Sequence, residues 1–236
     1  MHFVPIQLPE PETIPTALMR RAAAGDAMGL LEAAICGEFR GRIAAVSAFG
    51  TESAVLLAMI AEIDRATPVL FLDTGRHFPE TLDYRARLTE ALGLSDVRVI
   101  APAAEAVART DPGGELWFFD PDACCGLRKI VPLGTALDPF AAWISGRKRF
   151  QGGARAALPM VEAAGGRVKL NPLAAYTPDQ LAAEFARRNL PAHPLRAAGY
   201  PSIGCAPCTR PADPANPRAG RWAGRGKTEC GIHRPA

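Results

Sequence analysis

The chain has 236 residues, a length that fits one large domain or one domain with an appendage. Hydrophobic residues make up 48% and charged residues 22% of the sequence, values typical of a globular protein and not of low-complexity disorder. The net charge of +3 is too small to indicate a nucleic-acid or membrane partner, and no apolar run is long enough to span a bilayer. The N-terminus lacks the pattern of a signal peptide, so we expect a cytoplasmic protein with reduced thiols.

The first part of the chain alternates helices and strands. An extended arm is expected over residues 1–15, followed by a helix from Thr16 to Phe39. Apolar runs predict strands at 42–47, 69–72 and 97–100, with helices between them at 54–63 and 79–92. This alternation with short connections predicts an α/β fold with a doubly wound, mostly parallel sheet. Ligands of such sheets bind beyond the carboxyl ends of the strands, where the polar loops after residues 46 and 72 lie.

The second part of the chain is less regular. Strands are expected at 141–145 and 168–172, and Thr177, Pro178 and Asp179 form the start signal of a helix that ends near 189–191. Residues 211–228 are rich in Pro, Gly and Arg, which predicts a mobile tail. The expected organisation is therefore an N-terminal arm and helix over 1–40, a nucleotide-binding α/β domain over 41–210 and a mobile tail over 211–236.

Six cysteines form the most informative pattern. Four of them occur as two pairs, the adjacent Cys124 and Cys125 and the CxxC pair Cys205 and Cys208. Four thiolates suit a [4Fe–4S] cluster or a zinc ion. The alternative is two unrelated pairs, one of them a redox-active CxxC. Cys36 lies in an apolar helical segment and is expected to be a buried small hydrophobe.

Cys230 stands apart from the other cysteines, on the polar tail. The nearby Lys227 and His233 would favour its thiolate, which is the reactive form of a cysteine. A nucleophile on a tail could reach into a site and also move out to a partner. The alternative is an incidental surface thiol.

Two loops have the composition of anion sites. The segment SAFGTES at 47–53 connects a strand to a helix, where free amides and the helix dipole favour a phosphate, although it is not a Walker A loop. An ordinary strand–helix turn is the alternative. The second loop, 147–155, carries cations that could equally be solvated surface charge. Further cations follow the cysteine pair and precede Cys230, and one shared anion would explain the whole set: Arg128, Lys129, Arg218, Arg221, Arg225 and Lys227.

The motifs occur together in a specific order: SAFGTES (47–53), LDTGRHFPETLDYRARL (72–88), CCGLRK (124–129), WISGRKRFQGGAR (143–155), GYPSIGCAPCTRP (199–211), RAGRW (218–222) and ECGIH (229–233). This ordered set resembles the assimilatory adenylylsulfate (APS) and phosphoadenylylsulfate (PAPS) reductase family, over roughly residues 40–233. The resemblance implies an ATP-pyrophosphatase-like α/β fold. It also places the chain with the iron–sulfur type, in which Cys124, Cys125, Cys205 and Cys208 would ligate a [4Fe–4S] cluster.

The resemblance also implies roles for individual residues. Cys230 would be the catalytic nucleophile. The substrate would be bound by Ser47, Phe49, Gly50, Thr51, Glu52, Ser53, Asp73, Thr74, Gly75, Lys129, Arg147, Lys148, Arg149, Arg218, Arg221 and His233. The basic loop departs from the family's usual Arg-Arg-x-Gln-Ser, because Lys148-Arg149-Phe150-Gln151-Gly152 stands there. Which basic side chain of 147–155 contacts the substrate is therefore left open.

The implied reaction is the reduction of APS to sulfite and AMP in sulfate assimilation, through an S-sulfocysteine on Cys230. The reductant would be thioredoxin or glutaredoxin, and the enzyme a homodimer or homotetramer. PAPS, or both nucleotides, stays open as the substrate, since only the ribose 3′-phosphate separates the two. Two rival interpretations are an iron–sulfur tRNA sulfur transferase, whose first loop would carry paired glycines that this chain lacks, and a zinc-stapled nucleotide-binding module or redox sensor.

Overall fold

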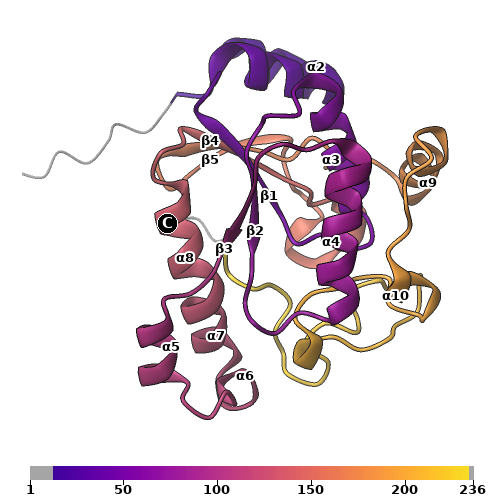
Figure 1. The fold of residues 1–236 in the computed structure, drawn as a ribbon. Coiled ribbons are helices and arrows are strands. Elements are labelled where there is room, and N and C mark those ends of the chain that lie inside the picture. Colours follow the sequence, from indigo (N-terminus) through magenta and orange to yellow (C-terminus); the bar gives the residue numbers. More distant parts are fainter. Residues whose placement is uncertain (1–12, 234–236) are drawn as a thin grey trace, which may run out of the picture.

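A six-stranded sheet forms the centre of the computed structural model, which describes residues 13–233 (Figure 1). The predicted arm at 1–15 thus lies almost wholly outside the described residues. The strand order is β3-β2-β1-β4-β6-β5, and only β5 runs antiparallel to its neighbour, β6. The predicted mostly parallel α/β sheet is confirmed. The strands are β1 (Ile43–Ser47), β2 (Val69–Leu72), β3 (Val97–Ile100), β4 (Ala142–Ser145), β5 (Val161–Ala164) and β6 (Arg167–Leu170).

Helices cover both faces of the sheet. Helices α2, α3 and α4 lie on one side and α8 lies on the other (Figure 1). Each side has its own apolar core, the larger one around α3 and the smaller one between α8 and the sheet. The helices are α1 (Thr16–Ala23), α2 (Ala27–Glu32), α3 (Ser53–Ile63), α4 (Pro79–Leu92), α5 (Ala104–Thr110), α6 (Leu116–Phe119), α7 (Pro121–Cys125), α8 (Val131–Leu137), α9 (Pro178–Arg187) and α10 (Pro194–Ala197).

The single helix predicted for 16–39 was wrong. Gly25, with φ of 67°, ends α1, and the Asp26 side chain then accepts a hydrogen bond from the Gly29 amide and caps α2. The chain continues as a π-helix over Ala33–Glu38. The expected burial of Cys36 was also wrong: Ala34 and Ile35 take the side that packs on the core, so Cys36 is exposed.

Residues that start or end a helix account for the helices whose bounds were predicted well from the sequence. Helix α4 begins with Pro79 at its first turn and ends at Gly93, whose φ of 62° only glycine adopts without strain. Helix α9 begins with a capping box, in which Thr177 and Gln180 each bond the other's backbone amide. The sequence analysis missed edge strand β5 and the helices between residues 104 and 137.

A π-helical segment, η2 (Gly126–Ile130), joins α7 to α8. The cysteine pair lies at the end of α7, so Arg128 and Lys129 follow it within this wider turn. π-Helical turns are rare and occur mostly at functional sites.

The segment predicted to be a mobile tail lies against the body of the protein in this structure. Arg225 donates to the carbonyls of Trp117 and Phe118, and Lys227 forms an ion pair with Asp122. Whether the segment moves stays a prediction. Among the described residues, no helix is both long and apolar enough to cross a membrane.

A buried histidine connects α4 to the loop before α10. His193 is 1% exposed, its Nδ1 accepts from the Leu195 amide, and its Nε2 lies 3.2 Å from the Thr81 hydroxyl. Burial lowers the pKa of His193 to about 4. The folded protein therefore holds this imidazole neutral at pH values where an unfolded chain would protonate it.

This difference predicts a pH-dependent stability. The contribution of His193 is complete above the unfolded pKa near 6.5 and is lost as the pH falls toward 4. We expect the unfolding free energy of the wild type to fall more steeply over this range than that of His193→Gln, measured by urea denaturation at several pH values. Parallel curves for the two proteins would contradict the burial of a neutral imidazole.

Candidate active site

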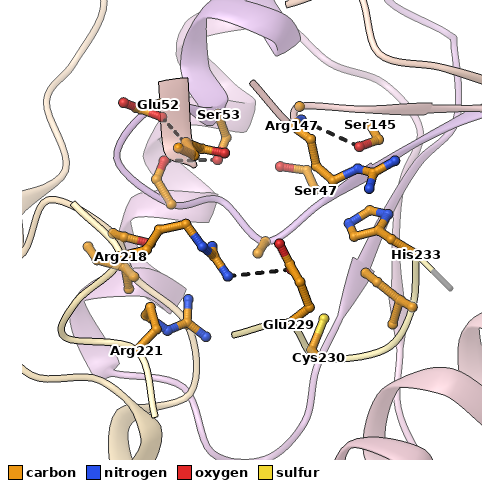
Figure 2. Close-up of a pocket in the computed structure, with 18 of the residues that line it drawn as sticks. Ser47, Glu52, Ser53, Ser145, Arg147, Arg218, Arg221, Glu229, Cys230 and His233 are labelled. Carbon is orange, nitrogen blue, oxygen red and sulfur yellow. Dashed lines mark hydrogen bonds and ion pairs between the residues drawn. The ribbon is translucent and has the colours of Figure 1, made fainter. Parts of the chain in front are cut away.

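A pocket lies where the chain changes direction across the sheet. Strand β1 pairs with β2 on one side and β4 on the other, so the loops that leave β1 and β4 diverge. Such a switch point opens a crevice at the carboxyl ends of parallel strands, where ligands bind. Both loops line the pocket, together with residues of the C-terminal segment (Figure 2).

The loop after β1 opens an anion-binding position. The Ser47 hydroxyl accepts from the Phe49 amide, and Thr51 donates to the carbonyl of Pro201, so both ends of the turn are fixed. Phe49 has φ of 47° and is fully buried against Phe71, which turns the chain sharply into α3. No side chain caps the N-terminus of α3, whose dipole and free amides favour a bound phosphate.

Six cations line the pocket, and four of them pair with carboxylates. Lys148 lies 2.7 Å from Glu52 and Arg147 lies 2.6 Å from Glu162, while Glu229 pairs with Arg155 at 2.5 Å and with Arg218 at 3.4 Å. Each pair neutralises a charge that would be costly to bury alone. Gln151 also donates to Glu52 and fastens the two loops together.

The remaining two cations are Lys129, in the π-helical turn, and Arg221, in the C-terminal segment. Neither forms an ion pair with a carboxylate in residues 13–233. Burial would lower the pKa of Lys129, but the nearby thiolates of Cys205, Cys230 and Cys125 outweigh it and raise that pKa. The pocket thus keeps positive charge beside Cys230 that an anionic ligand can neutralise.

His233 contributes no charge to this cluster. Burial, then the charges of Arg147 and Lys169, lower the pKa of His233 well below its usual value, so the imidazole is neutral. The ring stacks on Trp143, with centroids 5.5 Å apart and planes 6° apart. Of the two groups expected to favour a Cys230 thiolate, His233 is uncharged and Lys227 is paired with Asp122. Lys129, Arg221 and Arg218 are cations of the pocket that interact electrostatically with Cys230.

Four cysteines line a second, smaller cavity next to the pocket. Cys124, Cys125, Cys205 and Cys208 are all free thiols and reach it from α7 and from the CxxC turn. Arg76, Arg128 and Lys129 also line the cavity and place positive charge around it. Among the described residues, no three His, Cys, Asp or Glu side chains are placed to hold a metal ion.

A buried ion pair connects this cavity to the loop after β2, at the carboxyl edge of the sheet. Arg128 and Asp111 are 2.7 Å apart with side chains 7% and 3% exposed, and Arg128 also donates to the Thr74 carbonyl. The Thr74 hydroxyl in turn lies 3.3 Å from the sulfur of Cys205. These contacts connect α5, η2, the loop after β2 and the CxxC turn.

The comparisons with known proteins agree with this arrangement. Residues 42–211 match the family model of the phosphoadenosine phosphosulfate reductase domain. The chain belongs to this family. An adenosine 5′-phosphosulfate reductase of Mesorhizobium japonicum is 55% identical over 196 residues, which cover 83% of this chain and 77% of that protein. A phosphoadenosine 5′-phosphosulfate reductase of Gloeobacter violaceus is 42% identical over 210 residues, 86% of each chain.

A solved member of the family shares the fold. The crystal structure of phosphoadenylyl-sulfate reductase from Candida auris, a phosphate complex, superimposes with a TM-score of 0.71 at 24% identity and covers 85% of this chain and 100% of that one. The ATP-pyrophosphatase-like sheet expected from the motifs is therefore the fold of this reductase-family chain.

Most of the predicted substrate residues line the pocket: Ser47, Gly50, Thr51, Glu52, Ser53, Lys129, Arg147, Lys148, Arg218, Arg221 and His233, with Cys230 among them. Five others do not, and the substrate contacts of all sixteen residues stay predictions. Phe49 is in the core, and Arg149 is exposed and donates to the Leu158 carbonyl. Asp73, Thr74 and Gly75 belong to the loop after β2, beside the cysteine cavity.

The sequence analysis assigned no role to Glu229, Glu162 or Trp143. Glu229 stands next to Cys230 within a recognised motif, so its position was the available signal. Trp143 also opens a recognised motif, at 143–155, but its contact with Lys169, like that of Glu162, depends on strand pairing, which the local sequence does not show.

The contribution of the buried pair of Arg128 and Asp111 to the free energy of unfolding can be measured. Asp111→Ala would leave the Arg128 guanidinium buried without a counter-charge, which costs about 3–5 kcal/mol of unfolding free energy. Asp96→Ala removes an exposed pair with Arg98 and is the matched control, expected to cost less than about 1 kcal/mol. Urea denaturation measures both. Equal losses would show that Arg128 does not depend on Asp111.

Proposed function

We propose that this protein reduces adenylylsulfate (APS) to sulfite and AMP. One observation carries the proposal: Cys230 lies in the same pocket as the anion-binding loop at 47–53 and the cations Lys129 and Arg221. Relatives named as APS reductases, at up to 55% identity, support the choice of substrate. The expected cytoplasmic location, where dithiol proteins are kept reduced, agrees with such a reaction.

The first step is a displacement at sulfur. The Cys230 thiolate attacks the sulfonyl sulfur of APS, a bond forms between the two sulfurs, and the bond from sulfur to the phosphate oxygen breaks. AMP leaves with the electron pair of that bond. Lys129, Arg218 and Arg221 neutralise the negative charge that builds on the departing phosphate. Cys230 is left as S-sulfocysteine.

The second step releases sulfite and needs an external dithiol. A thiolate of thioredoxin or glutaredoxin attacks the sulfur of Cys230, sulfite departs with the bonding electrons, and the second thiol resolves the mixed disulfide. Two electrons thus pass from the dithiol to the sulfonyl group. Cys230 is half-buried, so the segment that carries it must become accessible for this step.

The four-cysteine cavity fits a [4Fe–4S] cluster held by Cys124, Cys125, Cys205 and Cys208. All four thiols line one cavity, and the cations that line it with them would oppose the negative charge of a four-thiolate cluster. When bound, the cluster would supply a compact charge that tunes the field at Lys129. The homodimer or homotetramer implied by the family resemblance stays a prediction.

PAPS is the alternative substrate, because a relative that is 42% identical is named as a PAPS reductase. The two activities differ in whether the pocket accepts a ribose 3′-phosphate. The experiment below therefore uses both nucleotides.

The proposal predicts which cysteine reacts. We expect anaerobic sulfite release from APS with reduced thioredoxin, and none from the Cys230→Ser variant, because the thiolate is lost. Cys36→Ser changes an exposed cysteine outside the pocket and should retain the wild-type rate. Equal rates with PAPS would mean that the 3′-phosphate is tolerated. Activity with neither nucleotide, in protein that holds its cluster, would reject the reductase assignment.

The cluster assignment predicts metal content and spectra. Protein purified without oxygen should contain about four irons and four sulfides per chain, and Cys208→Ser should lose most of this iron. Iron and zinc analysis with visible absorption would measure this. Zinc in place of iron would contradict the assignment, and a paramagnetic signal that rises and decays with turnover would contradict a purely electrostatic role.

A further inference from the structure

The chain around Cys230 is fastened on both sides of the cysteine. We infer that Arg155 and Trp143 are positioning residues that hold the Cys230 sulfur in the pocket, Arg155 by binding Glu229 and Trp143 by stacking on His233. Neither acts on the substrate in this role. The inference rests on the proposed function, in which Cys230 is the nucleophile.

The first anchor is the bidentate ion pair between Arg155 and Glu229. Arg155 donates from Nε and from its terminal nitrogen to the two carboxylate oxygens of Glu229, at 2.5 and 2.8 Å. A planar guanidinium that binds both oxygens fixes the direction of the carboxylate as well as its distance. Gln151 accepts a further hydrogen bond from Arg155, and Arg155 is 8% exposed, so the guanidinium itself has little freedom.

Arg218 strengthens this anchor from the opposite side. It donates to the Thr228 carbonyl at 2.5 Å and lies 3.4 Å from Glu229 (Figure 2). The two residues that precede Cys230 are thus both held, one through its backbone and one through its side chain.

The second anchor is Trp143, which lies on strand β4 and stacks with His233. Trp143 of β4 is the direct cross-strand partner of Lys169 on β6, and Lys169 is the partner of Glu162 on β5. The Lys169 ammonium lies 4.8 Å from the Trp143 ring centroid and 3.1 Å from Glu162. This row of three paired residues keeps the indole from turning. His233 stacks on it in an almost parallel orientation.

The two anchors bracket the nucleophile closely. Between Cys230 and His233 the chain turns at Gly231, with φ of 90°, so both anchored side chains and the cysteine point toward the pocket (Figure 2). A thiolate that attacks sulfur must approach opposite the leaving oxygen, and a misplacement of about 1 Å can cost about a hundredfold in rate. Releasing either anchor would widen the range of positions open to the sulfur.

The experiment compares Glu229→Gln, Arg155→Lys, Trp143→Leu and the conservative Trp143→Phe, with all proteins also carrying Cys36→Ser. Three quantities are measured on cluster-loaded protein: the rate at which iodoacetamide alkylates Cys230 without ligand, the single-turnover rate of S-sulfocysteine formation at saturating APS without reductant, and the Kd for AMP. Glu184→Gln removes an ion-paired carboxylate on α9 and serves as the matched control.

We expect Glu229→Gln and Trp143→Leu to raise alkylation several-fold and to slow the single turnover by about tenfold or more, with the Kd for AMP within about twofold of the wild type. Trp143→Phe, which keeps a flat ring, should recover most of the rate, and Glu184→Gln should change nothing. Arg155→Lys keeps the charge but loses the two-pronged geometry, so it should resemble Glu229→Gln.

Two results would overturn the inference. One is wild-type alkylation and turnover in both Glu229→Gln and Trp143→Leu. The other is a weaker Kd for AMP with unchanged turnover at saturation, which would make these residues part of nucleotide binding. If the wild type forms no adduct on Cys230, the proposed reaction fails, while the alkylation rates still decide whether the anchors hold the segment.

Discussion

Strand β1 pairs in parallel with β2 on one side and with β4 on the other, and the position of every functional group depends on this pairing. The chain leaves β1 toward β2 and leaves β4 toward β5, which lie on opposite sides of the sheet. A gap therefore opens between the loops that leave β1 and β4. One loop brings the amides of an uncapped helix to that gap, and the other brings a run of cations. The C-terminal segment then closes over the same edge.

Charge burial is the second constraint. A cation enclosed by protein is costly unless a counter-charge accompanies it. Three carboxylates, Glu52, Glu162 and Glu229, neutralise part of the positive charge of the pocket. These ion pairs hold the loops in place before any ligand binds. In residues 13–233, Lys129 and Arg221 form no ion pair with a carboxylate, and the charged groups that act on them include cysteines and other cations. Under the proposed function an anionic substrate supplies the missing counter-charge, and the thiolate that would attack it lies within the same field.

The sequence allowed good predictions where local chemistry sets structure. The bounds of α4 followed from Pro79 and from the residues before Gly93, and the capping box of Thr177 marked α9. The N-terminal helix was mispredicted because the apolar periodicity continues across Gly25 and Asp26, which break it.

Other features depend on contacts between distant segments. Edge strand β5 is short and carries Glu162, so it lacks the alternation that predicts a strand. The row formed by Glu162, Lys169 and Trp143 exists only because three strands pair in one register. The same holds for Arg155 and Glu229, which are separated by much of the second half of the chain. The motifs contain the reacting cysteine and also Trp143, Arg155 and Glu229, but the contacts by which these groups hold the cysteine were visible only in three dimensions.

The π-helical turn between α7 and α8 sets the direction in which the cysteine pair faces. A π-turn holds an extra residue compared with an α-turn, so each of its residues advances the side chains by less than the roughly 100° of an α-helix. If Gly126–Ile130 wound as an ordinary α-helix, α7 would be rotated relative to α8, which Leu133 and Leu137 hold against the sheet. Cys124 and Cys125 would then no longer face the CxxC turn. A substitution that changes the winding of this turn is therefore expected to move the cysteine pair, even where the substituted residue itself touches neither the cysteines nor the substrate.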